Sequence, residues 1–115
     1  METSEVIDAL SALAQESRLS AFRLLVGAGP EGLAAGEIAE ALGVAPATLS
    51  FHLKMLSHAG LIHSQREGRS IRYMASFDAM GELVDFLTSN CCGGDPGSCL
   101  PQRKPRRRAA AGGRR

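Results

Sequence analysis

The sequence predicts a mostly helical α+β fold, in which five helices accompany a two-stranded β-hairpin. Two patterns indicate this: apolar residues recur at helical spacing in five segments, and the spacing changes to that of strands between residues 61 and 75. Aromatic residues make up only 4% of the 115 residues, so the core must be built from aliphatic side chains. A chain of this length holds one compact domain with at most a short appendage.

The first two helices are predicted from apolar residues spaced three and four apart. One is expected over residues 4–14, where the hydroxyl of Ser4 is placed to cap the first turn. A polar break at residues 15–17 separates it from the second, which the glycine- and proline-containing run at residues 27–30 stops.

The next two helices are predicted to form a helix-turn-helix. A short third helix ends at Gly43, a residue suited to a left-handed terminus, and Pro46 suits the first turn of the fourth. The fourth helix places leucines on one face, at positions 49, 53 and 56, until Gly60 ends it. Only residues 43–45 separate the two helices, which is typical of the turn in this DNA-binding motif.

A hairpin and a last helix complete the expected domain. The runs 61–67 and 70–75 surround Gly68 and contain β-forming residues, so we expect two strands that form a wing. A helix over 78–90 carries more apolar residues than one small core covers. Because one helix-turn-helix contacts only a few base pairs, we expect a two-fold dimer through the first and last helices, bound to an inverted repeat in double-stranded operator DNA.

The residues expected to meet DNA lie on the fourth helix and the hairpin. If the leucine face stays on the protein, the outward residues of the fourth helix are Ala47, Thr48, Ser50, Phe51 and Lys54. His52 lies at the boundary, where a DNA contact and a local bond that braces the helix both remain open. On the hairpin, the residues expected to reach phosphates or a minor groove are Arg66, Arg69 and Arg72. A solvated basic hairpin is the alternative.

Charge divides the chain into a body and a tail. Residues 1–100 hold six basic and all twelve acidic residues, whereas residues 101–115 hold seven basic residues and no acid. The tail has no large apolar residue to offset the entropy of ordering, so it is expected to be disordered and to add non-specific affinity for DNA. We therefore expect a DNA-binding and dimerisation domain over 1–90, a cysteine-containing inducer segment over 91–100 and a basic tail over 101–115.

Several short motifs resemble one bacterial family. The sequence LSFHLKML at residues 49–56, AGL at 59–61 and REGR at 66–69 are similar to the ArsR/SmtB family of winged-helix metalloregulators, and the likeness spans about residues 6 to 90. The resemblance implies a homodimeric transcriptional repressor that releases its operator when an inducer binds. Apart from the resemblance, the lack of a bilayer-spanning run and of a leader favours a cytoplasmic protein, and the lack of catalytic motifs disfavours an enzyme.

The three cysteines indicate which inducer to expect. Cys91, Cys92 and Cys99 fall within nine residues, and the glycines between them allow the third thiol to fold back. Three thiolates suit a pyramidal trivalent metalloid, As(III) or Sb(III), whereas zinc would need a fourth donor such as His63, Asp95 or water. The family resemblance adds that some arsenic repressors carry a Cys-Cys pair and a third cysteine after the last helix. No organic cofactor is expected.

The cysteines and the fold are also compatible with functions other than arsenic sensing. A redox- or sulfide-responsive repressor of the same fold is the main alternative, with Cys99 pairing to Cys91 or Cys92. Cysteines without a function are a second alternative. An enzyme is disfavoured because the sequence has no glycine-rich phosphate loop, no His-Glu-x-x-His and no nucleophile elbow. No apolar run is long enough to cross a bilayer, and the N-terminus lacks a basic and apolar leader, so we expect a soluble protein.

Overall fold

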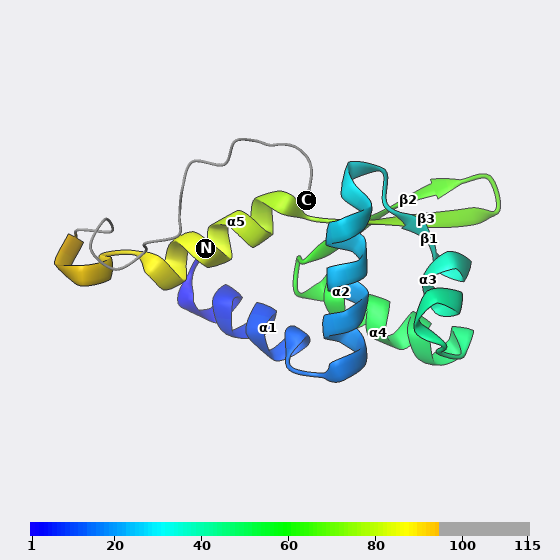
Figure 1. Cartoon of the computed structure of the whole chain (residues 1–115), viewed down its shortest axis with the longest axis horizontal. Helices are drawn as coiled ribbons and strands as arrows, with labels where there is room; N and C mark the ends of the chain where they lie inside the picture. Colours follow the sequence, from blue (N-terminus) through cyan, green and yellow to red (C-terminus); the bar gives the residue numbers. More distant parts are fainter. Residues whose placement is uncertain (95–115) are drawn as a thin grey trace. The chain divides into compact units, whose positions relative to one another are not determined.

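The computed structural model describes residues 1–94, and Figure 1 shows the arrangement of its elements. Five α-helices and a small sheet are present, as the sequence predicts, and two short 3-10 helices are added. In chain order the elements are α1 Thr3–Leu13, α2 Glu16–Ala28, η1 Gly29–Glu31, β1 Leu33–Ala34, α3 Ala35–Leu42, α4 Pro46–His58, β2 Ile62–Glu67, β3 Ser70–Ala75, α5 Phe77–Thr88 and η2 Cys91–Gly94.

The core is aliphatic, as the low aromatic content requires. Its largest fully buried side chains come from α2, α3, α4 and the residue before β2, namely Leu25, Ile38, Leu49, Leu53, Leu56 and Leu61. Within residues 1–94, Phe22 is the only aromatic residue among the buried core. Because each leucine or isoleucine contributes about 1.5–3 kcal/mol when buried, this cluster holds the two helices of the helix-turn-helix to α2.

The sheet has three strands, so the expected two-stranded hairpin is incomplete. The order is β1-β3-β2 and both pairings are antiparallel, with Leu33 opposite Tyr73 and Gln65 opposite Arg72. The strand β1 has only two residues, too few for a period of two to appear in the sequence. The hairpin of β2 and β3 itself forms at the predicted residues and projects from the helices (Figure 1).

Two helix starts differ from the expected ones. Ser4 lies inside α1 and does not cap it; instead the carboxylate of Glu5 accepts a hydrogen bond from the backbone N–H of Glu2 at 2.7 Å. The polar residues 15–17 contain the start of α2, because the side chain of Gln15 accepts from the backbone N–H of Arg18 at 2.9 Å. Polar side chains that serve as caps thus extend the second helix towards the first.

The chain divides into two compact units, Met1–Leu83 and Val84–Arg115. The first contains the helix-turn-helix and the sheet. The described part of the second contains the end of α5 and η2. The expected boundaries at 90/91 and 100/101 stay predictions, since residues 95–115 lie outside the described part of the chain.

Candidate DNA-binding surface and cysteine segment

A glycine forms the turn between α3 and α4. Gly43 has φ 65° and ψ 34°, the left-handed conformation that glycine adopts with little strain. The backbone N–H of Val44 donates to the carbonyl of Ala39 at 3.1 Å, which satisfies one of the carbonyls left open at the end of α3. Pro46 occupies the first turn of α4, where a missing N–H costs nothing. The turn therefore fixes where the recognition helix α4 begins.

The helix α4 has one face on the core and another in solvent. Leu49, Leu53 and Leu56 are each no more than 2% exposed, in agreement with the spacing of the leucines. The side chains predicted to meet DNA, His52 excepted, are exposed on this helix: Ala47, Thr48, Ser50, Phe51 and Lys54. Phe51 is 56% exposed, an unusual position for a large apolar ring unless a partner covers it. Their contacts with DNA stay predictions.

His52 belongs to the protein side of α4. It is only 8% exposed, its ring lies edge-on to Phe51, and its Nδ1 is 3.5 Å from a guanidinium nitrogen of Arg18 in α2. The local bracing interaction is therefore present in the structure. A direct contact between His52 and DNA stays a prediction.

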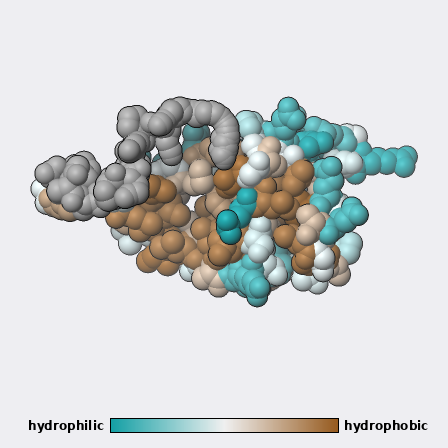
Figure 2. Space-filling view, in the orientation of Figure 1, coloured by the Kyte–Doolittle hydropathy of each residue, from teal (hydrophilic) through white to brown (hydrophobic). Residues whose placement is uncertain are grey.

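The three arginines of the hairpin lie in different surroundings. Arg66 and Arg69 are exposed, and Arg69 follows Gly68, whose φ of 61° forms the turn. Figure 2 shows a hydrophilic surface at the projecting end of the hairpin, as expected for a segment that approaches a polyanion. These two side chains are free to extend towards phosphates.

Arg72 instead holds the hairpin to the preceding loop. Its Nε donates to a carboxylate oxygen of Glu67 at 3.2 Å, and its Nη1 donates to the carbonyl oxygens of Glu31 and Gly32 at 3.3 Å each. Glu67 and Arg72 are diagonal neighbours in the β2–β3 register, so the hairpin pattern contained a signal for this ion pair. Bracing of the wing is thus the role of Arg72 that sequence reasoning missed, and its predicted contact with DNA stays untested.

The first two cysteines lie directly after α5. Cys91 and Cys92 begin η2, and their sulfur atoms are 3.9 Å apart. Cys92 is an exposed free cysteine with φ 53°, and Asn90 has φ 57°. Left-handed backbone at residues other than glycine costs of order 1–3 kcal/mol, so two strained residues flank Cys91. Cys99, the third predicted ligand, lies outside the described residues.

Within residues 1–94, no three His, Cys, Asp or Glu side chains gather in a way that would hold a metal ion. His63, considered as a fourth donor for zinc, is exposed on β2. A three-sulfur site would thus need Cys99 in addition to the described pair. In the same part of the chain, no helix combines the length and the apolar character needed to span a membrane.

Comparison with known proteins agrees with this geometry. A family described as a helix-turn-helix domain matches residues 13–65. The uncharacterized HTH-type transcriptional regulator YbzH of Bacillus subtilis is 30% identical over 95 residues, which is 72% of this chain and 95% of YbzH. These proteins are transcriptional regulators, a class without enzymatic function.

Similarity to solved structures identifies the family of transcriptional regulators more closely. An ArsR-like transcriptional regulator from Rhodococcus sp. RHA1 aligns with a TM-score of 0.69 and 26% identity, covering 85% of this chain and 90% of its own. A homodimeric winged helix-turn-helix DNA-binding domain from Mycobacterium bovis, described as a possible ArsR-family regulator, aligns with a TM-score of 0.61 and 30% identity, covering 76% and 81%. The chain belongs to the winged helix-turn-helix transcriptional regulators of the ArsR family.

Proposed function

We propose that the protein is a homodimeric repressor that leaves its operator when Cys91, Cys92 and Cys99 together bind As(III), with Sb(III) as a chemical analogue. The observation that carries the proposal is the pair of sulfur atoms 3.9 Å apart at the end of α5. Cys92 and Gly93 are left-handed, with φ of 53° and 68°, and the glycines of the sequence that follows give the chain the freedom that Cys99 would need to join the pair.

The chemistry of the sulfur set selects the inducer. Soft thiolates favour thiophilic ions, and three of them complete the pyramidal shell of a trivalent metalloid. Zinc prefers four ligands, so the three cysteines would need a fourth donor, such as His63, Asp95 or water, to hold it. As(III) uses all of the cysteines and leaves no ligand position empty.

The dimer is proposed to form through α1 and α5, each of which exposes apolar side chains. On α1, Ile7 is 57% exposed and Leu10 is 42% exposed, and Figure 2 shows hydrophobic surface over this helix. On α5, the exposed apolar residues are Phe77, Val84, Phe86 and Leu87. The Mycobacterium bovis relative is described as homodimeric, which supports the same assembly here. Two α4 helices would then read the two halves of an inverted repeat.

The test is DNA binding by the purified chain, under reducing conditions, with and without arsenite. An operator is first selected from random-sequence DNA, and binding is followed by fluorescence anisotropy. We expect arsenite to weaken binding about 5- to 150-fold, the range of a coupling free energy of about 1–3 kcal/mol. Cys91→Ser, Cys92→Ser and Cys99→Ser should each bind the operator and fail to respond to arsenite, whereas the control Ser98→Ala should respond normally.

Two results would change this assignment. Normal release by arsenite in all three serine variants would show that the cysteines are not the site. Release by hydrogen peroxide or a polysulfide, reversed by dithiothreitol and without any response to arsenite, would assign the redox- or sulfide-responsive alternative instead.

A further inference from the structure

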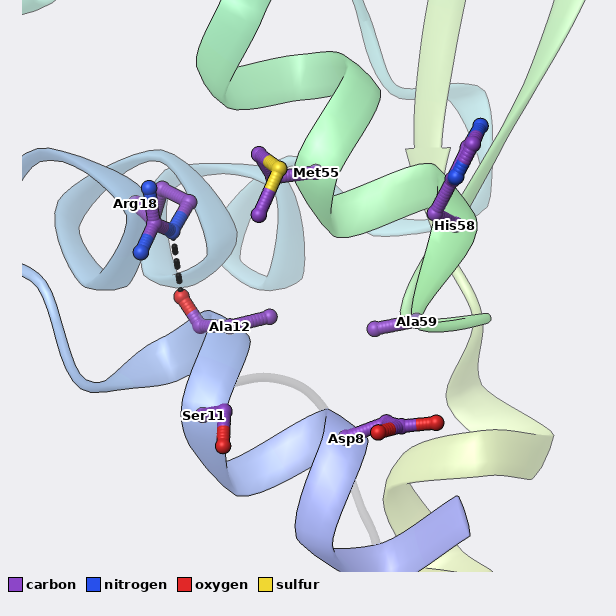
Figure 3. Close-up of a pocket in the computed structure, with 7 residues that line it drawn as sticks. All are labelled: Asp8, Ser11, Ala12, Arg18, Met55, His58 and Ala59. Carbon is purple, nitrogen blue, oxygen red and sulfur yellow. Dashed lines mark hydrogen bonds between the residues drawn. The ribbon is translucent and has the colours of Figure 1, made fainter.

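Arg18 connects three helices by hydrogen bonds from its backbone and its side chain. Its backbone N–H donates to the side chain of Gln15, at the start of α2, and its Nε donates to the carbonyl oxygen of Ala12 at 2.7 Å (Figure 3). A second guanidinium nitrogen, Nη1, lies 3.5 Å from Nδ1 of His52 on the recognition helix α4. One half-buried side chain thus contacts both the end of α1 and the middle of α4.

The chemistry of arginine fixes the direction of the contact with His52. A guanidinium carries only donors, so Nδ1 of the ring must accept, and the neutral imidazole then carries its proton on Nε2. The ring is 8% exposed, so water is a poor substitute for this donor. Removal of Arg18 would leave the buried acceptor of His52 unsatisfied.

The charge of Arg18 is not used in an ion pair within the described residues. The salt bridges of residues 1–94 join the N-terminus to Glu82 and Arg72 to Glu67. Arg18 instead lines an open pocket of about 450 Å³ between α1 and α4, together with Met55 and Ala59 (Figure 3). Within the described residues, Arg18 therefore makes directed hydrogen bonds across a pocket that apolar side chains do not fill.

We propose that Arg18 is a positioning residue for DNA binding, which ties the end of α1 to His52 and so fixes the orientation of the recognition helix α4. The DNA-facing residues Thr48 and Lys54 flank His52 on the same helix. Thr48 lies about 6 Å from His52 along the helix axis, so a tilt of about 10° would move it by about 1 Å. Base-edge hydrogen bonds do not tolerate such a shift without loss.

The same contact couples the dimer interface to the recognition helix, a consequence that rests on the proposed dimer. If α1 packs against the partner subunit, Arg18 transmits the position of that helix to α4. The Arg18–His52 contact belongs to the DNA-competent form and does not involve arsenic. A failure of the Arg18 proposal and a failure of the arsenic proposal are therefore seen in separate measurements.

A double-mutant cycle in operator affinity tests the proposal. The variants are Arg18→Ala, His52→Phe and the combination, and the matched control is Arg23→Ala, which removes the same charge from an exposed position on the same helix. Each single variant should weaken operator binding about 2- to 30-fold, the range found for residues that couple distant sites. The double variant should bind the operator about as tightly as Arg18→Ala alone, because Arg18→Ala already removes the contact that His52→Phe breaks.

Two further variants keep the test decisive if either substitution disturbs folding. Arg18→Lys retains the charge but reaches only one of the two acceptors, so an intermediate loss is expected. His52→Asn retains an acceptor in the position of Nδ1 and should recover most of the affinity lost in His52→Phe. Each association constant is measured at a temperature well below the midpoint of thermal unfolding of that variant. It is then divided by the fraction of the protein that is active in DNA binding, which a stoichiometric titration gives.

Nitrogen-15 NMR of the imidazole gives a readout that does not involve DNA. The wild-type spectrum should show His52 as the Nε2–H tautomer, and Arg18→Ala should lose this preference while Arg23→Ala keeps it. Additive losses in the cycle, or the same His52 tautomer with and without Arg18, would overturn the proposal. So would an Arg18→Ala protein whose folded fraction binds the operator as tightly as the wild type.

Discussion

The loop before β1 provides the sharpest test of the fold that carries the site, because one glycine there is doubly constrained. Gly32 has φ 66° and ψ −160°, a region essentially restricted to glycine. A Cβ placed on it would overlap the carbonyl oxygen of Tyr73 and lie 2.8 Å from the side chain of Met74, so alanine meets the backbone of β3. The substitution Gly32→Ala should therefore disturb the pairing of β1 with β3.

The expected magnitude follows from the two constraints. The strained backbone costs about 1–3 kcal/mol. Displacement of the neighbouring strand adds about 1–3 kcal/mol. Gly32→Ala should thus lower the free energy of unfolding by about 2–6 kcal/mol. The control Gly43→Ala has φ 65° with no atom within 4 Å, so only the left-handed penalty of about 1–2 kcal/mol applies. Gly27→Ala, in the helical α2 and with open space around it, should stabilise by about 0.5–1 kcal/mol.

Urea unfolding followed by circular dichroism measures all three changes. Protein concentration must be held constant, because the stability of a dimer depends on it. From most to least stable, the expected order is Gly27→Ala, wild type, Gly43→Ala and Gly32→Ala, with the same slope of unfolding free energy against urea concentration for all four proteins. A Gly32→Ala protein as stable as Gly43→Ala would refute the steric argument and the close approach of β1 to β3.

Three further predictions concern the DNA-binding surface, the tail and the dimer. Lys54→Ala should weaken binding to specific and non-specific DNA alike and reduce the slope of log affinity against log salt by about 1 if Lys54 contacts a phosphate; an unchanged slope would remove it from the interface. Truncation after Leu100 removes seven positive charges and should reduce the salt slope while the preference for the operator is retained; equal slopes would show that the tail does not contact DNA. Ile7→Glu, at a side chain 57% exposed, should leave the fold intact and shift sedimentation from dimer to monomer, whereas Ser20→Glu, at an exposed position of α2, should remain dimeric; dimeric Ile7→Glu would exclude this face of α1.

The helix-turn-helix could be predicted from the sequence because its signals are local. The leucines at positions 49, 53 and 56 repeat with the helical period, Gly43 marks the turn and Pro46 marks the next start, all within one segment of the chain. The pairing of Leu33 with Tyr73 joins residues far apart in sequence through a strand of two residues, for which no period exists. Local pattern therefore gave the hairpin and missed the third strand.

The polar contacts behind the DNA-binding surface were harder to predict than the surface itself. Arg18 and His52 are 34 positions apart, and nothing in the sequence near either residue indicates its partner. The cluster of basic residues on the hairpin predicts a DNA contact for Arg72, which stays a prediction, but charge alone gives no sign of its hydrogen bonds to the carbonyls of Glu31 and Gly32. The distinction depends on where the loop before β1 lies, which only the tertiary structure provides.

The packing of α4 limits how an inducer can release DNA. The side chains of Leu49, Leu53 and Leu56 are each at most 2% exposed. Loss of the contacts of one such leucine costs about 2–5 kcal/mol of stability. The coupling free energy available to a typical effector is about 1–3 kcal/mol, which is less than the cost of lifting α4 from its own core. We therefore expect the proposed inducer, bound after α5, to leave each recognition helix packed as it is. On the proposed mechanism, the change lies in the separation or inclination of the two α4 helices across the dimer, where exposed apolar contacts on α1 and α5 can be exchanged at lower cost.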